Sequence, residues 1–193
     1  MRTTGPGQPD QLLLDVLDAL RRIRVPAAVA GGFAVSYHGL PRATRDADAV
    51  VWPRGAGMDP DQLSQHLRTG GFDVVLRHGD PGDPIGASLQ IRDPHGNSVD
   101  LLIGVRGMDP EAPSRTVEAP FFDDRVRLLG AEDLIAMKLF AAGPVDIEDV
   151  RSILHVSGPT LDLPLLRRLA RRYGPEEEKA LDALLREAGL QAP

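Results

Sequence analysis

The sequence predicts an α/β fold of the α+β kind, in which a sheet flanked by helices is followed by a helical C-terminal part. Strand-like alternation and helix-like periodicity take turns through the first two thirds of the 193 residues, and clear turn residues separate them. From Ala131 onward the patterns are helical. We therefore expect an α/β core over residues 1–130 and a helical subdomain over residues 131–193.

The expected elements follow from periodicity, β-branched content and turn residues. Strands are expected over residues 27–31, 46–51, 72–78, 87–93 and 98–104, with weaker ones over 115–121 and 126–129. Helices are expected over residues 11–23, 33–39, 60–69, 131–142, 145–155, 163–174 and 175–189. Asp10 is placed to cap the first helix, and a Pro-His-Gly-Asn turn predicts a hairpin between the strands over 87–93 and 98–104.

Composition excludes several classes of protein. The 22 basic and 28 acidic side chains give a net charge of −6, which argues against binding nucleic acid through bulk positive charge. The chain has no cysteine, so disulfides, zinc ribbons and thiolate nucleophiles are excluded. Apolar runs fall short of the roughly 20 residues that span a bilayer, and the N-terminus lacks a signal-peptide pattern. We therefore expect a cytoplasmic protein that does not enter a membrane.

An acidic pair, Asp46 and Asp48, is the first candidate for chemistry. Residues two apart in a strand point to the same face, so the two carboxylates are expected side by side. Mg²⁺ uses carboxylates of this kind together with substrate phosphates. The other interpretation is a solvated edge strand that carries acidic residues, and the pair taken alone favours it.

The surrounding residues favour a site for a phosphorylated ligand. Gly31 and Gly32 stand at a strand-to-helix turn, where backbone N–H groups and a helix N-terminus can bind an anion. Thirteen residues separate Gly32 from Asp46, enough for one helix and a return loop that bring the two features together. Asp100, alone among apolar neighbours, is either a third carboxylate of this site or an acid on the wet face of its strand.

These residues resemble the nucleotidyltransferases of the DNA polymerase beta superfamily. The resemblance consists of a Gly-Gly turn, thirteen residues, an Asp-Ala-Asp motif leading into an apolar run, and a later Asp between apolar residues. The AbiEii-type branch, known from toxin–antitoxin systems, has patterns similar to GGFAVSYHG–PRATRDADAVV and MKLFAAGPVDIEDVRSIL. The resemblance covers residues 29–51, 99–103 and 133–154, and it implies a polymerase-beta-like sheet flanked by helices.

The resemblance also implies roles for the acids. Asp46 and Asp48 would ligate the Mg²⁺, or Mn²⁺, that carries the triphosphate of an NTP substrate. Asp100 would bind a second ion and help to deprotonate the acceptor. Asp146 and Asp149 match acids of a later helix of the family, although Val145 stands where that helix usually has a basic residue.

Phosphate binding is expected from six residues: Gly31, Gly32, Ser36, Arg42, Arg45 and Lys138. Many family members have Gly-Ser where this chain has Gly-Gly, so a hydroxyl that often touches phosphate is absent at position 32. The planar guanidinium of arginine suits phosphate oxygens, while the alternative is that Arg42 and Arg45 neutralise the neighbouring acids. Lys138, one of two lysines beside twenty arginines, has apolar neighbours, and we expect its ammonium in a polar cavity rather than at the surface.

The function implied is an Mg²⁺-dependent transfer of a nucleoside monophosphate from an NTP to a hydroxyl acceptor, with release of pyrophosphate. The acceptor would be an RNA such as tRNA, and the enzyme would be the toxin of a toxin–antitoxin pair with a cognate antitoxin as partner. Two alternatives stay open: transfer to a small molecule such as an aminoglycoside-like antibiotic, and a non-catalytic protein that binds a nucleotide or a partner. A cluster on one expected helix is either an RNA contact or a solvated face balanced by glutamates: Arg167, Arg168, Arg171 and Arg172.

Overall fold

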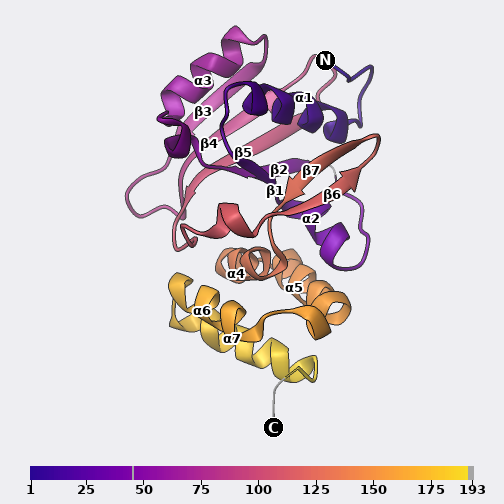
Figure 1. Cartoon of the computed structure of the whole chain (residues 1–193), viewed down its shortest axis with the longest axis vertical. Coiled ribbons are helices and arrows are strands. Elements are labelled where there is room, and N and C mark those ends of the chain that lie inside the picture. Colours follow the sequence, from indigo (N-terminus) through magenta and orange to yellow (C-terminus); the bar gives the residue numbers. More distant parts are fainter. Residues whose placement is uncertain (45, 191–193) are drawn as a thin grey trace. The chain divides into compact units, whose positions relative to one another are not determined.

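A seven-stranded mixed sheet is the main element of this computed structural model, which describes residues 1–44 and 46–190 (Figure 1). The strands are β1 (Ala27–Val29), β2 (Ala47–Val51), β3 (Asp73–His78), β4 (Ile85–Arg92), β5 (Ser98–Val105), β6 (Val117–Phe121) and β7 (Asp124–Leu128). Their order across the sheet is β3-β4-β5-β2-β1-β7-β6. The α/β prediction is confirmed, and each expected strand is present with shifted ends.

The helices also follow the predicted order. They are α1 (Pro9–Arg22), α2 (Gly31–His38), α3 (Pro60–Thr69), α4 (Ala131–Ala141), α5 (Pro144–Ser157), α6 (Leu163–Tyr173) and α7 (Pro175–Glu187). The prediction that Asp10 caps the first helix is wrong, because the helix begins at Pro9 and Asp10 lies in its first turn. Proline suits a first helical position, since its φ is already helical and it has no N–H to leave unpaired. No helix in the described part of the chain is long and apolar enough to cross a membrane.

The chain divides into two compact units, neither of which is continuous in sequence. Unit 1 contains residues 1–33, 43–106 and 118–127, and unit 2 contains residues 34–42, 107–117 and 128 onward. The predicted domain boundary after residue 130 stays a prediction.

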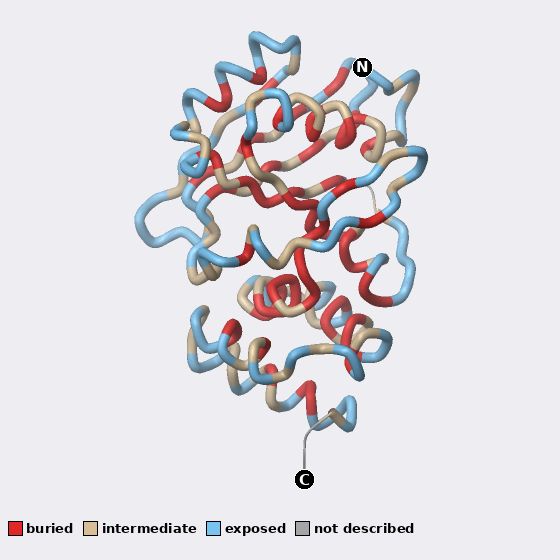
Figure 2. Tube along the Cα trace, in the orientation of Figure 1, coloured by how far each residue is buried: buried red, intermediate tan, exposed pale blue. Residues whose placement is uncertain are grey.

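In unit 1, strands β4 and β5 present one apolar and one polar face. Alternate residues of β4 and β5 are buried on the apolar face: Ala87, Leu89, Ile91, Val99, Leu101 and Ile103. Helix α1 packs on β2 and β5, and α3 packs on β3, so these helices cover that face (Figures 1 and 2). Because strand residues alternate in direction, the residues between the buried ones lie on the opposite, polar face.

A hairpin joins β4 to β5, as the turn residues predict, and the two strands pair antiparallel. Its turn is held by Asp93, whose Oδ1 accepts the N–H groups of His95 and Asn97 at 2.9 Å each. Asn97 Oδ1 in turn accepts the N–H of Gln8 at 2.7 Å, just before α1 begins. These hydrogen bonds fix the start of α1 against the end of the hairpin, so α1 lies across the apolar face.

In unit 2, α4 is the central helix and packs against α5, α6 and α7. Leu134 and Ile135 of α4 are fully buried, as are Ile153 of α5 and Leu166 of α6. Asp133, also buried in α4, accepts two hydrogen bonds of 2.8 Å from the guanidinium of Arg115. The helical C-terminal part is therefore confirmed as a packed helical bundle, to which the segment 107–117 is fastened by a buried ion pair.

Candidate active site

Three carboxylates gather on the polar face of the sheet in unit 1. Strand β2 pairs in parallel with β5, and in this register Asp48 lies directly opposite Asp100. Residues paired in register point to the same face. Asp46 immediately precedes β2, and its carboxylate accepts a hydrogen bond from Ser98, which lies two residues before Asp100 on β5. The negative charge of Asp46, after burial, raises the pKa of Asp100, so the two carboxyl groups are close enough to interact electrostatically. The structure therefore brings Asp46, Asp48 and Asp100 to one side of the sheet.

The carboxylate of Asp48 lies against the glycine turn at the start of α2. A Cβ atom on Gly31 would collide with Oδ2 of Asp48, and Gly31 adopts a φ of +56°. The backbone is held here as well, because the Ala30 N–H donates to the carbonyl oxygen of Asp48 at 2.8 Å. Only glycine combines this backbone conformation with such a close approach. The turn thus holds the first N–H groups of α2 beside an acid of the β2 strand.

The carboxyl group of Asp100 has a raised pKa. Its partial burial raises its pKa, and the charge of Asp46 raises it further. A hydrogen bond with Gln90 and the charges of Arg77 and Arg92 oppose this rise without cancelling it. The pKa of Asp100 therefore lies above that of an ordinary aspartate, so its carboxylate binds a proton more readily.

Gln90, Arg77 and Arg92 were not expected from the sequence. Gln90 is the register partner of Asp100 on β4, and its Oε1 accepts a hydrogen bond of 2.6 Å from Arg92. Arg77 reaches the same face from β3. The alternation of β4 could have predicted that Gln90 and Arg92 lie on the polar face, since both occupy polar positions that alternate with buried apolar ones.

Asp46 is held from two sides at the exposed edge of the group. Ser98 Oγ donates to its Oδ1 at 3.1 Å, and Thr44 Oγ1 donates to its carbonyl oxygen at 2.8 Å. Ser98 precedes Asp100 by two residues on β5, so it lies on the same face. The Ser98 contact therefore ties the Asp46 carboxylate to the strand that carries Asp100.

The three acids fit a hard divalent cation in donor type. In residues 1–44 and 46–190, no three histidine, aspartate or glutamate side chains already form a metal-binding cluster. The carboxylate oxygens of Asp46, Asp48 and Asp100 are nevertheless the donors that Mg²⁺ or Mn²⁺ prefers. Partial burial and the nearby charge of Asp46 both raise the pKa of Asp100, and a bound cation would favour its ionised form.

Unit 2 holds a second, ionic group of predicted residues. Lys138 is buried, and its Nζ lies 2.6 Å from Asp146 Oδ1 and 2.8 Å from Asp149 Oδ2. Arg42 binds the same Asp149 through two contacts. Its Nε lies 2.7 Å from Oδ1, and its Nη2 donates to Oδ2 at 3.0 Å. Burial alone would lower the pKa of Lys138, but its hydrogen bonds to the two aspartates outweigh burial and raise it. The ammonium is therefore charged and occupies an interior polar cluster.

The predicted site residues thus fall into two groups. Unit 1 holds Gly31, Gly32, Asp46, Asp48 and Asp100, and unit 2 holds Ser36, Arg42, Lys138, Asp146 and Asp149. Ser36 belongs to the second group because its Oγ accepts the N–H of Arg42 at 3.2 Å. Arg45 lies outside the described residues. That the two groups bind one nucleotide stays a prediction.

The arginine-rich helix α6 is engaged with acids of its own unit. Arg167 forms an ion pair with Asp182 of α7, and Arg171 Nε lies 3.1 Å from Glu178. Arg172 Nε donates to the carbonyl oxygen of Gly107 at 3.1 Å. These contacts favour the interpretation of this cluster as a balanced helix face.

Solved structures of known proteins share the fold of this chain. No family model matches the sequence, and no curated protein is similar to it. Among solved structures, ANT(2'')-Ia in complex with adenylyl-2''-tobramycin is similar with a TM-score of 0.60 and 19% identity, over 86% of this chain and 98% of that one. The solution structure of the antibiotic-resistance factor ANT(2'')-Ia has a TM-score of 0.58 and 17% identity, over 94% and 97% of the chains.

A third similar structure is an antigenic nucleotidyltransferase-like protein from Paracoccidioides brasiliensis. Its TM-score is 0.51 and its identity 16%, over 95% of this chain and 91% of that chain. At such low identities the similarity establishes a shared fold. The chain therefore has a nucleotidyltransferase-type fold, as the expected polymerase-beta-like sheet requires.

We expect Gly31→Ala to be more harmful than Gly57→Ala, a matched control with a φ of +72° and open space around it. Each alanine adds backbone strain of about 1–2 kcal/mol, but only Gly31→Ala also collides with Asp48. Urea unfolding should therefore show the larger loss for Gly31→Ala, and Asp48→Ala added to it should recover the difference. Equal losses in the two single variants would contradict the packing of Asp48 on the turn.

Asp100→Asn should stabilise the metal-free protein at neutral pH. The folded-state pKa of Asp100 is raised, so its ionised form opposes folding above that pKa, and the penalty disappears as the pH falls below it. Melting temperatures in a chelator should therefore differ most near pH 7 and converge in acid. Added Mg²⁺ should raise the melting temperature of the wild type more than that of the variant. A difference that does not change with pH would refute this assignment.

Lys138→Met should destabilise the protein by about 3–5 kcal/mol, because Asp146 and Asp149 lose a buried cation. The control is Lys179→Met, which removes the chain's other lysine from an exposed ion pair with Glu176 and should change stability little. Asp146→Asn should restore part of the stability in the Lys138→Met background. Equal stability of the two lysine variants in urea unfolding would show that the interior cluster is not stabilising.

Proposed function

We propose that this protein transfers a nucleoside monophosphate from an NTP to a hydroxyl acceptor and releases pyrophosphate. One observation carries the proposal: Asp48 and Asp100 are register partners on the polar sheet face, and Asp48 lies on the glycine turn. The nucleotidyltransferase-type fold supports it independently, because the same fold occurs in ANT(2'')-Ia.

In this proposal Asp46, Asp48 and Asp100 hold Mg²⁺, or Mn²⁺ in its place. The bound cation would neutralise charge on the phosphate oxygens. The first N–H groups of α2, at Gly31 and Gly32, have no acceptor within the helix and would bind the phosphate chain of the NTP. The protein's own contribution is then mainly to orient the triphosphate between the turn and the acids.

Asp100 is the proposed general base. The acceptor hydroxyl oxygen forms a bond to the α-phosphorus, the bond from that phosphorus to the leaving pyrophosphate breaks, and the hydroxyl proton passes to a carboxylate oxygen of Asp100. Its place beside Asp48 on the polar face would put this carboxylate next to the reacting phosphate, within reach of the hydroxyl proton. Gln90, which hydrogen-bonds to this carboxyl group, would keep it oriented.

The charges beside Asp100 favour an anionic acceptor such as RNA, with tRNA as the proposed example. Arg77 and Arg92 act on Asp100 through their positive charges, so two guanidinium groups lie near the acid group. Phosphate groups of an RNA would be attracted there, whereas a polycation would be repelled. These local positive charges are compatible with the acidic net charge of the chain.

The second candidate is transfer to a small molecule such as an aminoglycoside-like antibiotic. It is favoured by the similarity to ANT(2'')-Ia, whose structure contains adenylyl-2''-tobramycin. The two candidates share the chemistry at the acids and differ in the acceptor. Arg77 and Arg92 therefore discriminate between them, since charge reversal at both positions should weaken RNA labelling and favour a cationic acceptor.

The biological setting is proposed from the sequence resemblance. Similarity of residues 29–51 to the AbiEii-type branch supports a toxin of a toxin–antitoxin pair, with a cognate antitoxin as its partner and the cytoplasm as its location. Growth arrest on expression of the wild type, and normal growth with Asp48→Asn, is the outcome that this setting requires.

The direct test incubates the protein with each labelled NTP, Mg²⁺, and either total tRNA or a panel of aminoglycosides. Asp48→Asn should lower transfer by orders of magnitude while the fold persists, because one of the three clustered carboxylates is lost. The control is Asp61→Asn, which neutralises an exposed aspartate of α3 and should transfer normally. Labelling of no acceptor by the wild type, or equal labelling by Asp48→Asn, would refute the proposal.

A further inference from the structure

A cavity of about 450 Å³ opens in unit 1 beside the C-terminal end of α1. Its apolar wall is formed by Leu17 and Leu20 of α1 and by Val25, which follows that helix. Ala27 of β1 and the neighbouring strand β7 complete it. The volume lies in the range of small-ligand sites, roughly 300–1,000 Å³.

This cavity lies on the sheet face opposite to the acid group. Helix α1 packs on β2 and β5, where buried Ala47 and Ala49 flank Asp48 and buried Val99 and Leu101 flank Asp100. Residues that alternate along a strand point to opposite faces, so the wall contributed by α1 is separated from the acids by the sheet. A ligand in the cavity would therefore not occupy the position proposed for the NTP.

The rim of the cavity is strongly basic. Among the described residues that line it are four arginines, Arg21, Arg24, Arg125 and Arg127, and a single acidic residue, Glu118. This excess of positive charge occurs in a chain whose net charge is −6. Charges beside an apolar wall are less screened by water than charges on an open surface, so their attraction for an anion is stronger.

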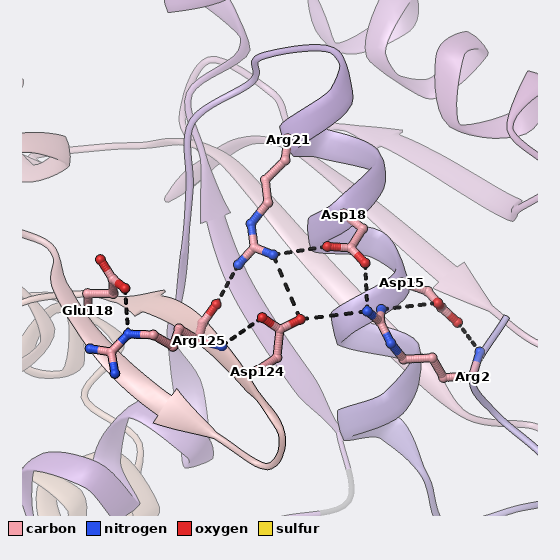
Figure 3. A network of polar contacts seen from close by, with 7 residues as sticks. All are labelled: Arg2, Asp15, Asp18, Arg21, Glu118, Asp124 and Arg125. Atoms are coloured by element: carbon pink, nitrogen blue, oxygen red, sulfur yellow. Dashed lines mark hydrogen bonds and ion pairs between the residues drawn. The ribbon is translucent and has the colours of Figure 1, made fainter.

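Two of the arginines are held in place by the polar network in Figure 3. Arg21 donates to Asp18 at 2.9 Å and to the carbonyl oxygen of Arg125 at 2.6 Å. Arg125 Nε lies 2.6 Å from Glu118. These contacts join α1 to strands β6 and β7, and they give the cavity a defined rim.

The other two arginines have no such contacts. In the described part of the chain, neither the Arg24 nor the Arg127 side chain has a hydrogen bond or an ion pair. Arg127 lies two residues from Arg125 on β7 with buried Val126 between them, so both point to the exposed side of the strand. Two guanidinium groups are thus available to an anion at the rim.

Arg24 also occupies a backbone position that favours glycine. Its φ is +58°, and its N–H donates to Arg21 O while the N–H of Val25 donates to Leu20 O, each at 3.0 Å. This is the hydrogen-bond pattern that closes a helix, and the residue at the position of Arg24 is usually glycine. An arginine at this position has a more strained backbone than glycine would have, and it places a guanidinium group at the cavity.

We propose that this cavity binds a small ligand through an oligophosphate group, with pyrophosphate as the minimal example and the phosphate chain of a free nucleotide as the larger one. Arg24 and Arg127 bind the phosphate oxygens, and the apolar wall formed by Leu17 and Leu20 accommodates the rest of a nucleotide. A small ligand is favoured over a polymer because the apolar wall and the arginines enclose a nucleotide-sized volume.

The test is calorimetric titration of the full chain with pyrophosphate in a chelator, without divalent cations. Under these conditions no cation is present at the acid group to hold an anion, and the arginine variants identify the binding that belongs to the cavity. We expect the wild type to bind, and Arg24→Gly and Arg127→Gln each to weaken binding about tenfold or more, because each removes a charge-assisted contact. Arg24→Gly should keep its unfolding midpoint, since glycine suits that backbone conformation.

Two controls make the result decisive. Arg22→Gln removes a positive charge at the C-terminal end of α1, from a residue that does not line the cavity. This variant should bind pyrophosphate like the wild type. Asp48→Asn, inactive under the proposed function, should also bind pyrophosphate normally. Failure of nucleotidyl transfer and failure of this proposal are therefore distinguishable.

Several results would overturn the proposal. The first is no binding of pyrophosphate by the wild type, and the second is equal affinity in the wild type, Arg24→Gly and Arg127→Gln. The third is a loss of affinity in Arg22→Gln as large as in the two cavity variants, and the fourth is loss of binding in Asp48→Asn. In a second arm a short RNA replaces pyrophosphate. If Arg24 and Arg127 are needed for RNA but not for pyrophosphate, the cavity is part of a polymer-binding surface and the small-ligand proposal is wrong.

Discussion

The contact between the Asp48 carboxylate and Gly31 is the constraint on which the candidate site depends. Strand β2 can carry its acid beside the start of α2 only because position 31 has no side chain and tolerates a positive φ. The same strand pairs with β5, so the position of Asp48 also determines where Asp100 lies. One close approach thus relates a helix N-terminus, which attracts anions, to carboxylates, which attract cations.

Charge is balanced differently in the two units. In unit 2 the buried Asp149 contacts both Lys138 and Arg42, and this ionic cluster is satisfied by its own side chains. In unit 1 partial burial and the charge of Asp46 keep the pKa of Asp100 raised although Gln90 and two arginines act on it, so its ionised form is not fully stabilised. A group of acids in this state on an exposed sheet face is typical of a site that binds a cation together with its substrate.

The sheet separates two surfaces of opposite charge within unit 1. The polar face carries the acids, and the side covered by α1 carries the arginine-lined cavity. The salt bridges of Arg2 with Asp18 and of Arg21 with Asp18 fasten the N-terminal segment and α1, while Arg21 also binds the backbone of β7. This network stabilises the arrangement of the cavity rim and leaves Arg24 and Arg127 to interact with a ligand.

The sequence by itself determined the elements, their order and the acidic pair, because periodicity, turn residues and spacing are local properties of the chain. It pointed to Asp100 and to an interior position for Lys138, but not to their neighbours. Only the tertiary structure decided that Gln90 contacts Asp100, that Lys138 and Arg42 share Asp149, and that Pro9 rather than Asp10 begins α1. The partners of Asp100, Lys138 and Arg42 depend on strand register and helix packing between distant residues, which no local pattern encodes.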